Sequence, residues 1–181
     1  MIKKHSETIL LFLFLAVFGF CARLLPHPAN IAPIAALALF GALYLPKRVS
    51  IVLPLFAMVT SDFFIGFYQW QIMLSVYASF ITIGCIGLFI RNKKNFFTIG
   101  ASTLSGSILF FLITNAAVWE FSSMYPKTFQ GLIESYTMAL PFFRNTLLGD
   151  IFYSTLLIGG FELVGYALHV RKIFQLQSEN R

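Results

Sequence analysis

The chain has 181 residues, is 58% hydrophobic and only 11% charged, and carries a formal net charge of +6. A soluble domain has about 25% charged residues, so this composition excludes an ordinary soluble protein and indicates one integral membrane domain, residues 1–181. The basic residues form short clusters beside apolar runs, a pattern typical of topology signals and anionic lipid contact, which excludes nucleic acid as the expected partner.

The first apolar run, Ile9 to Phe20, follows Lys3 and Lys4 and resembles a signal peptide. Cleavage or lipid attachment beside Cys21 needs a small preceding residue, and Phe20 is large. We therefore expect this run to be a retained transmembrane helix.

Six apolar runs predict six transmembrane helices, because a helix needs about 20 residues to cross the hydrocarbon. The second run is short for a crossing, so a tilted or partly re-entrant segment is an alternative, and Pro28 and Pro33 fit a helix start. The predicted spans are about 8–25, 31–45, 49–66, 72–90, 96–119 and 145–169.

A further short helix is predicted between the fifth and sixth spans, around residues 129–143. Apolar residues from Leu132 to Leu140 recur there at helical spacing. We expect this amphipathic helix to lie on the outer surface or to act as a lid.

The positions of Lys and Arg predict the orientation of these spans. Ten of the 13 fall at the two ends of the chain or in alternate connections, and only Arg23, Lys127 and Arg144 lie on the other side. Cytoplasmic loops carry the Lys/Arg excess, so both termini are expected in the cytoplasm. The ten are Lys3, Lys4, Lys47, Arg48, Arg91, Lys93, Lys94, Arg171, Lys172 and Arg181.

Most other polar residues gather toward the outward ends of the spans, which predicts a solute site open to the outside. A charge inside a span is costly and therefore indicates a functional or a structural role. Asp150 either contacts a ligand, or pairs with Arg144 or Arg23, or caps a helix. The candidate substrate-binding residues are His27, Asn30, Asp62, Asn115, Trp119, Tyr125, Arg144, Asn145 and Asp150.

Three of these candidates have a specific expectation. Asn115 and Trp119 are one helical turn apart and suit a planar polar ligand, although interhelical bonding and an interfacial tryptophan are alternatives. His27 lies between two prolines that stiffen its backbone, so it is a candidate ligand or metal contact. The sequence contains no HExxH motif, nucleophile elbow or P-loop, so we expect no intrinsic cofactor, no ATPase activity and no enzyme.

Small residues recur in the second span, where Ala32 and Ala36, and Ala38 and Ala42, form small-xxx-small pairs. Such pairs let two helices approach closely. They predict either internal packing or a docking surface for another membrane protein.

Residues 30–42 read Asn-x-x-Pro-x-x-Ala-Leu-Ala-Leu-x-Gly-Ala, and Ser61-Asp62 is followed by Gly66. Thr114-Asn115, Tyr125-Pro126 and the run from Leu140 to Asp150 add to the pattern. Over about residues 23–153 the chain resembles the substrate-binding S components of energy-coupling-factor vitamin transporters.

The resemblance implies a six-helix protein of the bacterial cytoplasmic (inner) membrane that captures a vitamin-like solute from outside and delivers it inward. It implies energy-coupling-factor transmembrane and ATPase subunits as possible partners, contacted through the alanine pairs. The nearest analogues are small, solitary cobalamin transporters, which implies cobalamin as the transported ligand, with Cys85 as a cobalt ligand and His27 beside it.

Two other functions stay open. Asp150 and His27 would serve as acid and base in an intramembrane enzyme acting on a lipid-soluble substrate. A non-transporting assembly factor would instead use the glycine and alanine surfaces to bind a partner.

Overall fold

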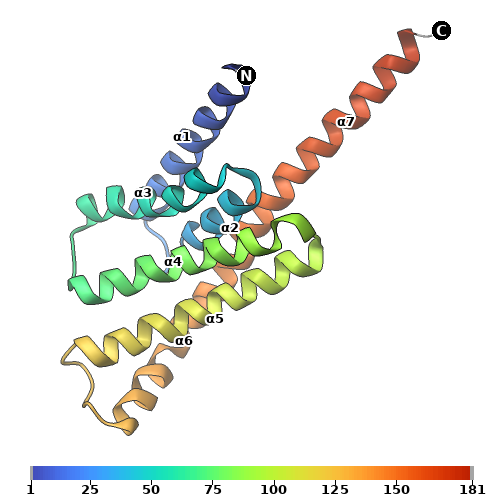
Figure 1. Cartoon of the computed structure of the whole chain (residues 1–181). Coiled ribbons are helices and arrows are strands. Elements are labelled where there is room, and N and C mark those ends of the chain that lie inside the picture. The colour runs from blue at the N-terminus through green and yellow to red at the C-terminus, as the bar shows by residue number, and fades with distance from the viewer. Residues whose placement is uncertain (1, 180–181) are drawn as a thin grey trace.

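The computed structural model describes the backbone of residues 2–179 and the side chains of residues 6–169, and the regular structure in that range is helical throughout (Figure 1). Five stretches are long and apolar enough to cross a membrane, which indicates a multi-pass membrane protein. The helices are α1 (Ile2–Leu24), α2 (Ile34–Tyr44), α3 (Lys47–Ile65), α4 (Trp70–Ile90), the short η1 (Arg91–Lys93), α5 (Phe96–Phe121), α6 (Phe129–Ser154), η2 (Thr155–Gly159) and α7 (Gly160–Glu179).

Helix α2 is the centre of the bundle. It is apolar on all sides, and ten of its 11 residues are buried, as expected for a helix enclosed by others. It contacts α1, α3, α4, α5, α6 and η2. At about 1.5 Å per residue it is roughly 16 Å long, about half the hydrocarbon thickness. The other half of the bundle axis is therefore left to the irregular residues 25–33 and to side chains.

Around α2, α1 packs parallel to α3, since Phe12 and Phe20 of α1 lie against Phe56 and Phe64 of α3, whereas α4 and α5, and α5 and α6, are antiparallel neighbours. In Figure 1 the connections 66–69 and 122–128 lie at one end of the bundle, and 45–46 and 91–95 at the other. Side-chain bonds agree with this arrangement. The Gln69 amide donates to the carbonyl of Phe121 at the first end, and Arg91 donates to the carbonyl of Leu45 at the second.

The expected amphipathic helix around 129–143 is part of a longer helix. Helix α6 runs without interruption through Pro141 to Ser154, and the π-helical turn η2 joins it to α7. Its first half packs against α5, where Ser135 donates to the carbonyl of Asn115 and Tyr136 to that of Leu112. The prediction of a separate surface helix was wrong because these contacts align the segment with the bundle.

At the end of the bundle with the basic connections, a cluster joins α2 and α7 to the connection 91–95. Glu162 accepts hydrogen bonds from Tyr44 and Lys94, both at 2.5 Å, and the Lys94 ammonium lies over the Tyr44 ring. The rings of Phe40, Tyr44 and Phe161 pack together directly beneath. Five of the predicted basic residues lie outside the range 6–169 in which side chains are described, namely Lys3, Lys4, Arg171, Lys172 and Arg181.

The alanine pairs of α2 pack inside the protein. Ala36, Ala38 and Ala42 are at most 1% exposed, and Ala42 lies where a Cβ on Gly87 of α4 would meet it at 2.6 Å. The predicted partner surface is therefore already covered by the chain's own helices in this structure. Ala32, which is half-buried, precedes α2 and lines the cavity described next.

Candidate solute-binding cavity

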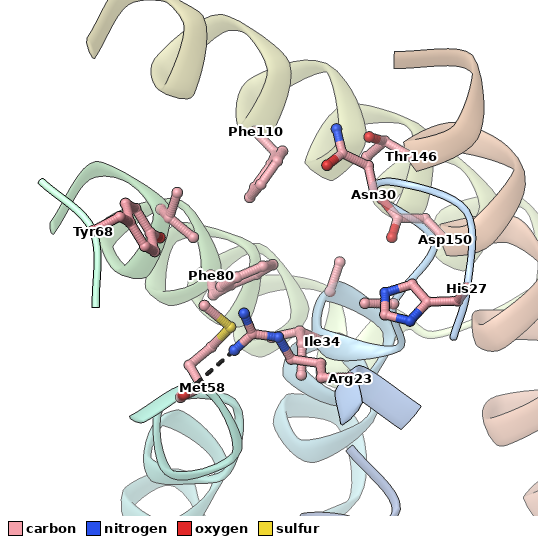
Figure 2. Close-up of a pocket in the computed structure, with 13 residues that line it drawn as sticks. Arg23, His27, Asn30, Ile34, Met58, Tyr68, Phe80, Phe110, Thr146 and Asp150 are labelled. Atoms are coloured by element: carbon pink, nitrogen blue, oxygen red, sulfur yellow. Dashed lines mark hydrogen bonds between the residues drawn. The ribbon is translucent and has the colours of Figure 1, made fainter. Parts of the chain in front are cut away.

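A cavity of about 240 Å³ lies above the start of α2, in the half of the bundle that this short helix leaves open. The chain from residue 25 to residue 33 borders it, and α1, α3, α4, α5 and α6 supply the remaining walls. Figure 2 shows Asp150, Thr146 and Asn30 on one side and Phe110, Phe80 and Tyr68 on the other. The lining residues are Arg23, His27, Asn30, Ala32, Ile34, Ala35, Met58, Tyr68, Val76, Phe80, Phe110, Thr146 and Asp150.

A second chamber of about 340 Å³ adjoins the first and shares Asn30, Tyr68, Val76, Phe110 and Thr146 with it. Its additional walls come from the C-terminal half of α5, the middle of α6, the first turn of α4 and residue 29. The residues that line only this chamber are Ala29, Ile72, Phe111, Thr114, Asn115, Val118, Ala139, Phe142 and Phe143.

One polar cluster of the cavity joins α1, α3 and α4. The Arg23 guanidinium forms an ion pair of 2.8 Å with Asp62, whose side chain is 1% exposed, and also donates to Ser61 Oγ and to the carbonyl of Met58. The Tyr77 hydroxyl donates to the second carboxylate oxygen of Asp62 at 2.6 Å. Asp62 is therefore neutralised and hydrogen-bonded on both oxygens, as a buried charge requires.

Asp150 presents the opposite situation. It is 4% exposed and accepts a hydrogen bond of 2.7 Å from Ser107 of α5. Among the side chains that the structure describes, no Lys, Arg or His nitrogen lies within ion-pair distance of it. Of the interpretations left open by the sequence, pairing with Arg23 or Arg144 is therefore absent, and Asp150 lies in the wall of a cavity.

The segment before α2 positions His27 and Asn30. Asn30 has a left-handed backbone with φ of 65°, and the neighbouring carbonyl of Ala29 accepts a hydrogen bond from Asn145 of α6. Gly149 allows this segment to approach α6, since a Cβ there would meet Ile31 at 3.3 Å. His27 Nδ1 lies 2.6 Å from the carbonyl of Leu25, which can only accept, so Nδ1 carries a hydrogen, which leaves Nε2 as the acceptor in the uncharged tautomer.

The structure brings together only part of the predicted site. His27, Asn30 and Asp150 line the first chamber, and Asn115 lines the second. Asp62 lines neither chamber but forms the ion pair with the lining residue Arg23. Asn145 also lines neither chamber, and it donates a hydrogen bond to the segment 25–33 that borders the cavity. Trp119, Tyr125 and Arg144 line neither chamber. Trp119 donates instead to the carbonyl of Pro126, and Lys127 donates to that of Trp119, so both serve the connection 122–128.

The predicted cobalt ligand lies away from the cavity. Cys85 is exposed on α4 and lines neither chamber, so it does not meet His27 at a common site in this structure. Cys21 is exposed on α1. Among the described residues, no group of three or more His, Cys, Asp or Glu side chains is arranged to hold a metal ion.

Arg23, Phe80, Phe110 and Thr146 are cavity residues that the sequence did not single out as solute contacts. Arg23 carried a usable signal, because a basic residue on the outward side runs against the Lys/Arg pattern. Tyr68 was also missed. The pKa of Tyr68 is raised to about 12, because the side chain is partly buried and the Asp62 carboxylate is near, and Arg23 offsets this only in part. The Tyr68 hydroxyl therefore stays a hydrogen-bond donor.

Comparison with known proteins gives one match. No curated protein matches the chain, and no solved structure matches it. A family model described as a family of unknown function, DUF6580, matches residues 3–173. Because this match covers nearly the whole chain and every wall of the cavity, the chain belongs to the DUF6580 family.

Proposed function

We propose that this protein is a membrane uptake protein that captures a small, vitamin-like solute from the outer side and delivers it inward, alone or with an ATP-driven partner module. The observation that carries the proposal is the cavity, because its wall contains the buried carboxyl of Asp150, which has no ion-pair partner among the side chains that the structure describes. Ionisable groups in such bundles are costly and commonly mark solute pathways.

The proposed orientation has six crossings, with α2 as a half-length central crossing and both termini in the cytoplasm of a bacterial cell. The basic connections support it, since Lys47, Arg48, Arg91, Lys93 and Lys94 belong to one end of the bundle. The cavity borders the segments 25–33 and 66–69 of the opposite end, so in this orientation it faces outward.

Thiol labelling tests this orientation. In a variant without the native cysteines, Ser123→Cys is expected to react with a membrane-impermeant maleimide on intact cells lacking an outer-membrane barrier. Asn92→Cys is expected to react only after the membrane is opened. Both positions are exposed in connections at opposite ends of the bundle, which makes them a matched pair. The reverse labelling pattern would refute the orientation.

The size of the cavity favours a solute smaller than a corrinoid. Each chamber has about 240 or 340 Å³, at or below the low end of typical small-molecule sites. A corrinoid macrocycle with its side chains exceeds either chamber, and the cysteine that would bind cobalt is outside both. Cobalamin therefore enters the proposal only if the outer connections open widely.

Ligand identification and uptake together test the function. After gentle purification, mass spectrometry of the extracted protein is expected to find one co-purifying solute at near-equimolar amount. Cells that express the protein should accumulate that solute with saturable kinetics, whereas an Asp150→Asn variant should show at least a tenfold lower rate. If cells with and without the protein accumulate the co-purifying solute and a panel of labelled vitamins, cobalamin included, at equal rates, uptake is excluded.

An intramembrane enzyme is the second candidate, because His27 and Asp150 line the same chamber. This reading predicts that the extracted solute is converted to a product by the purified protein and that His27→Gln abolishes conversion while retaining binding. Recovery of the unchanged solute after prolonged incubation would exclude it. The assembly-factor interpretation has less support from the alanine pairs, since Ala36, Ala38 and Ala42 are buried among the chain's own helices.

A further inference from the structure

We infer that the solute carries a cationic nitrogen next to a planar ring, with Asp150 as the counter-ion of that nitrogen. This assignment of a substrate class rests on the proposed uptake function and goes beyond it, because it states the charge and shape that the cavity selects.

The charges around the cavity do not balance. Arg23 and Asp62 neutralise each other at 2.8 Å, with Ser61 and Tyr77 completing their hydrogen bonds. Within the part of the chain whose side chains are described, Asp150 bonds only to the neutral hydroxyl of Ser107. A carboxyl buried without a cation takes up a proton, whereas a cation bound beside Asp150 would keep it ionised, so the occupied lining supplies one negative charge. Burying such a charge without a partner is unfavourable, so a monocation is the ligand that the lining best stabilises.

The start of α2 does not cancel this charge. Ile34 and Ala35 of its first turn line the cavity, and a helix N-terminus contributes a partial charge of roughly +0.5. Half a charge leaves a net negative lining. The free N–H groups of this first turn remain available for an uncharged acceptor atom of the same solute.

The wall opposite Asp150 is aromatic (Figure 2). The rings of Phe80 and Phe110 are 5.2 Å apart and only 32° from parallel, and Tyr68 lies beside them in the lining. Such a wall suits a planar ring and also attracts a cation held in front of it. His27 Nε2 and the Asn30 amide offer an acceptor and a donor–acceptor pair for the polar rim of the ring.

Three ring-bearing probes of nearly equal size test the inference: benzylammonium, benzyl alcohol and benzoate. Their dissociation constants for the purified full-length protein are measured by ligand-observed NMR in detergent. We expect benzylammonium to bind at least tenfold more tightly than benzyl alcohol, and benzoate to bind most weakly. Equal or tighter binding of benzyl alcohol or benzoate would overturn the assignment, and this comparison requires no variant.

A pair of matched variants then assigns the selectivity to Asp150. Asp150→Asn keeps the shape of the side chain and its hydrogen bond with Ser107. It is expected to weaken the binding of benzylammonium at least tenfold while leaving the dissociation constant of benzyl alcohol nearly unchanged. Glu134→Gln removes the same charge from an exposed site on the same helix and should bind all three probes as the parent does. If Asp150→Asn does not fold, Phe110→Leu serves instead. This variant should weaken the binding of benzylammonium more than the binding of benzyl alcohol. Unchanged selectivity in the folded variant would contradict the role.

The two proposals fail in different ways. Selective binding of benzylammonium without any solute uptake by cells would leave the cation site standing and remove the uptake function. Saturable uptake of a solute without a cationic nitrogen would keep the uptake function and remove the cation site.

Discussion

Replacing Arg23 with methionine is expected to lower the free energy of unfolding by about 3–5 kcal/mol, the usual cost of removing one partner of a buried ion pair. Asp62 is 1% exposed, so its carboxylate would lose its cation in surroundings that water does not reach. Ser61 and the carbonyl of Met58 would each lose a donor as well. Unfolding in mixed micelles, followed by circular dichroism, measures the change.

A double-mutant cycle separates the ion pair from the volume of the side chain. The combined variant Arg23→Met with Asp62→Asn is expected to be more stable than the sum of the two single losses, because neither partner is then left as an unpaired charge. Lys94→Gln is the control at the opposite end of the bundle. The Lys94–Glu162 pair is largely exposed, at 35% and 53%, so its loss should change stability by no more than about 1 kcal/mol. Strict additivity of the two cavity substitutions would contradict the coupling.

The second large effect is expected at Gly87, where α4 crosses α2. An alanine Cβ there would lie 2.6 Å from the Cβ of Ala42, and neither atom can rotate away. Gly87→Ala should therefore force the two helices apart and cost about 1–3 kcal/mol. Because α2 also forms the floor of the cavity through Ile34 and Ala35, probe binding should weaken together with stability.

Gly84 of the same helix is the matched control, since a Cβ there meets nothing within 4 Å. Gly84→Ala should be neutral or stabilise by up to about 1 kcal/mol, because alanine restricts the unfolded chain more than glycine. The thermal unfolding midpoints of the two variants, measured side by side in the same detergent, test the packing. Equal midpoints would show that α4 does not approach α2 closely at Gly87.

Local chemistry alone was enough to predict most helices. The apolar runs and Pro33 place the start of α2 within a few residues, and the predicted spans 49–66 and 96–119 begin within about two residues of α3 and α5. The alternation of basic connections also matches the two ends of the bundle. These features depend on near neighbours in the chain, so they can be read without knowing the packing.

Partnership between distant residues could not be read in this way. The sequence offered both Asp62 and Asp150 as candidate substrate-binding residues, yet among the described side chains α1 brings Arg23 to Asp62 while α5 brings a serine to Asp150. Contacts with α5 align the first half of α6 with the bundle. Ala42 of the alanine pairs packs against α4 of the same chain. Each outcome depends on which helix is the spatial neighbour.

The sequence by itself therefore determined the helical class, the approximate spans and the separation of basic and polar ends, because hydropathy and charge act residue by residue. Only the tertiary structure decided where the cavity lies, since an 11-residue α2 fills one half of the bundle axis and leaves the other half to irregular chain and side chains. It also decided which carboxylate has no cation within ion-pair distance among the described side chains, because ion pairing is a property of three-dimensional neighbours.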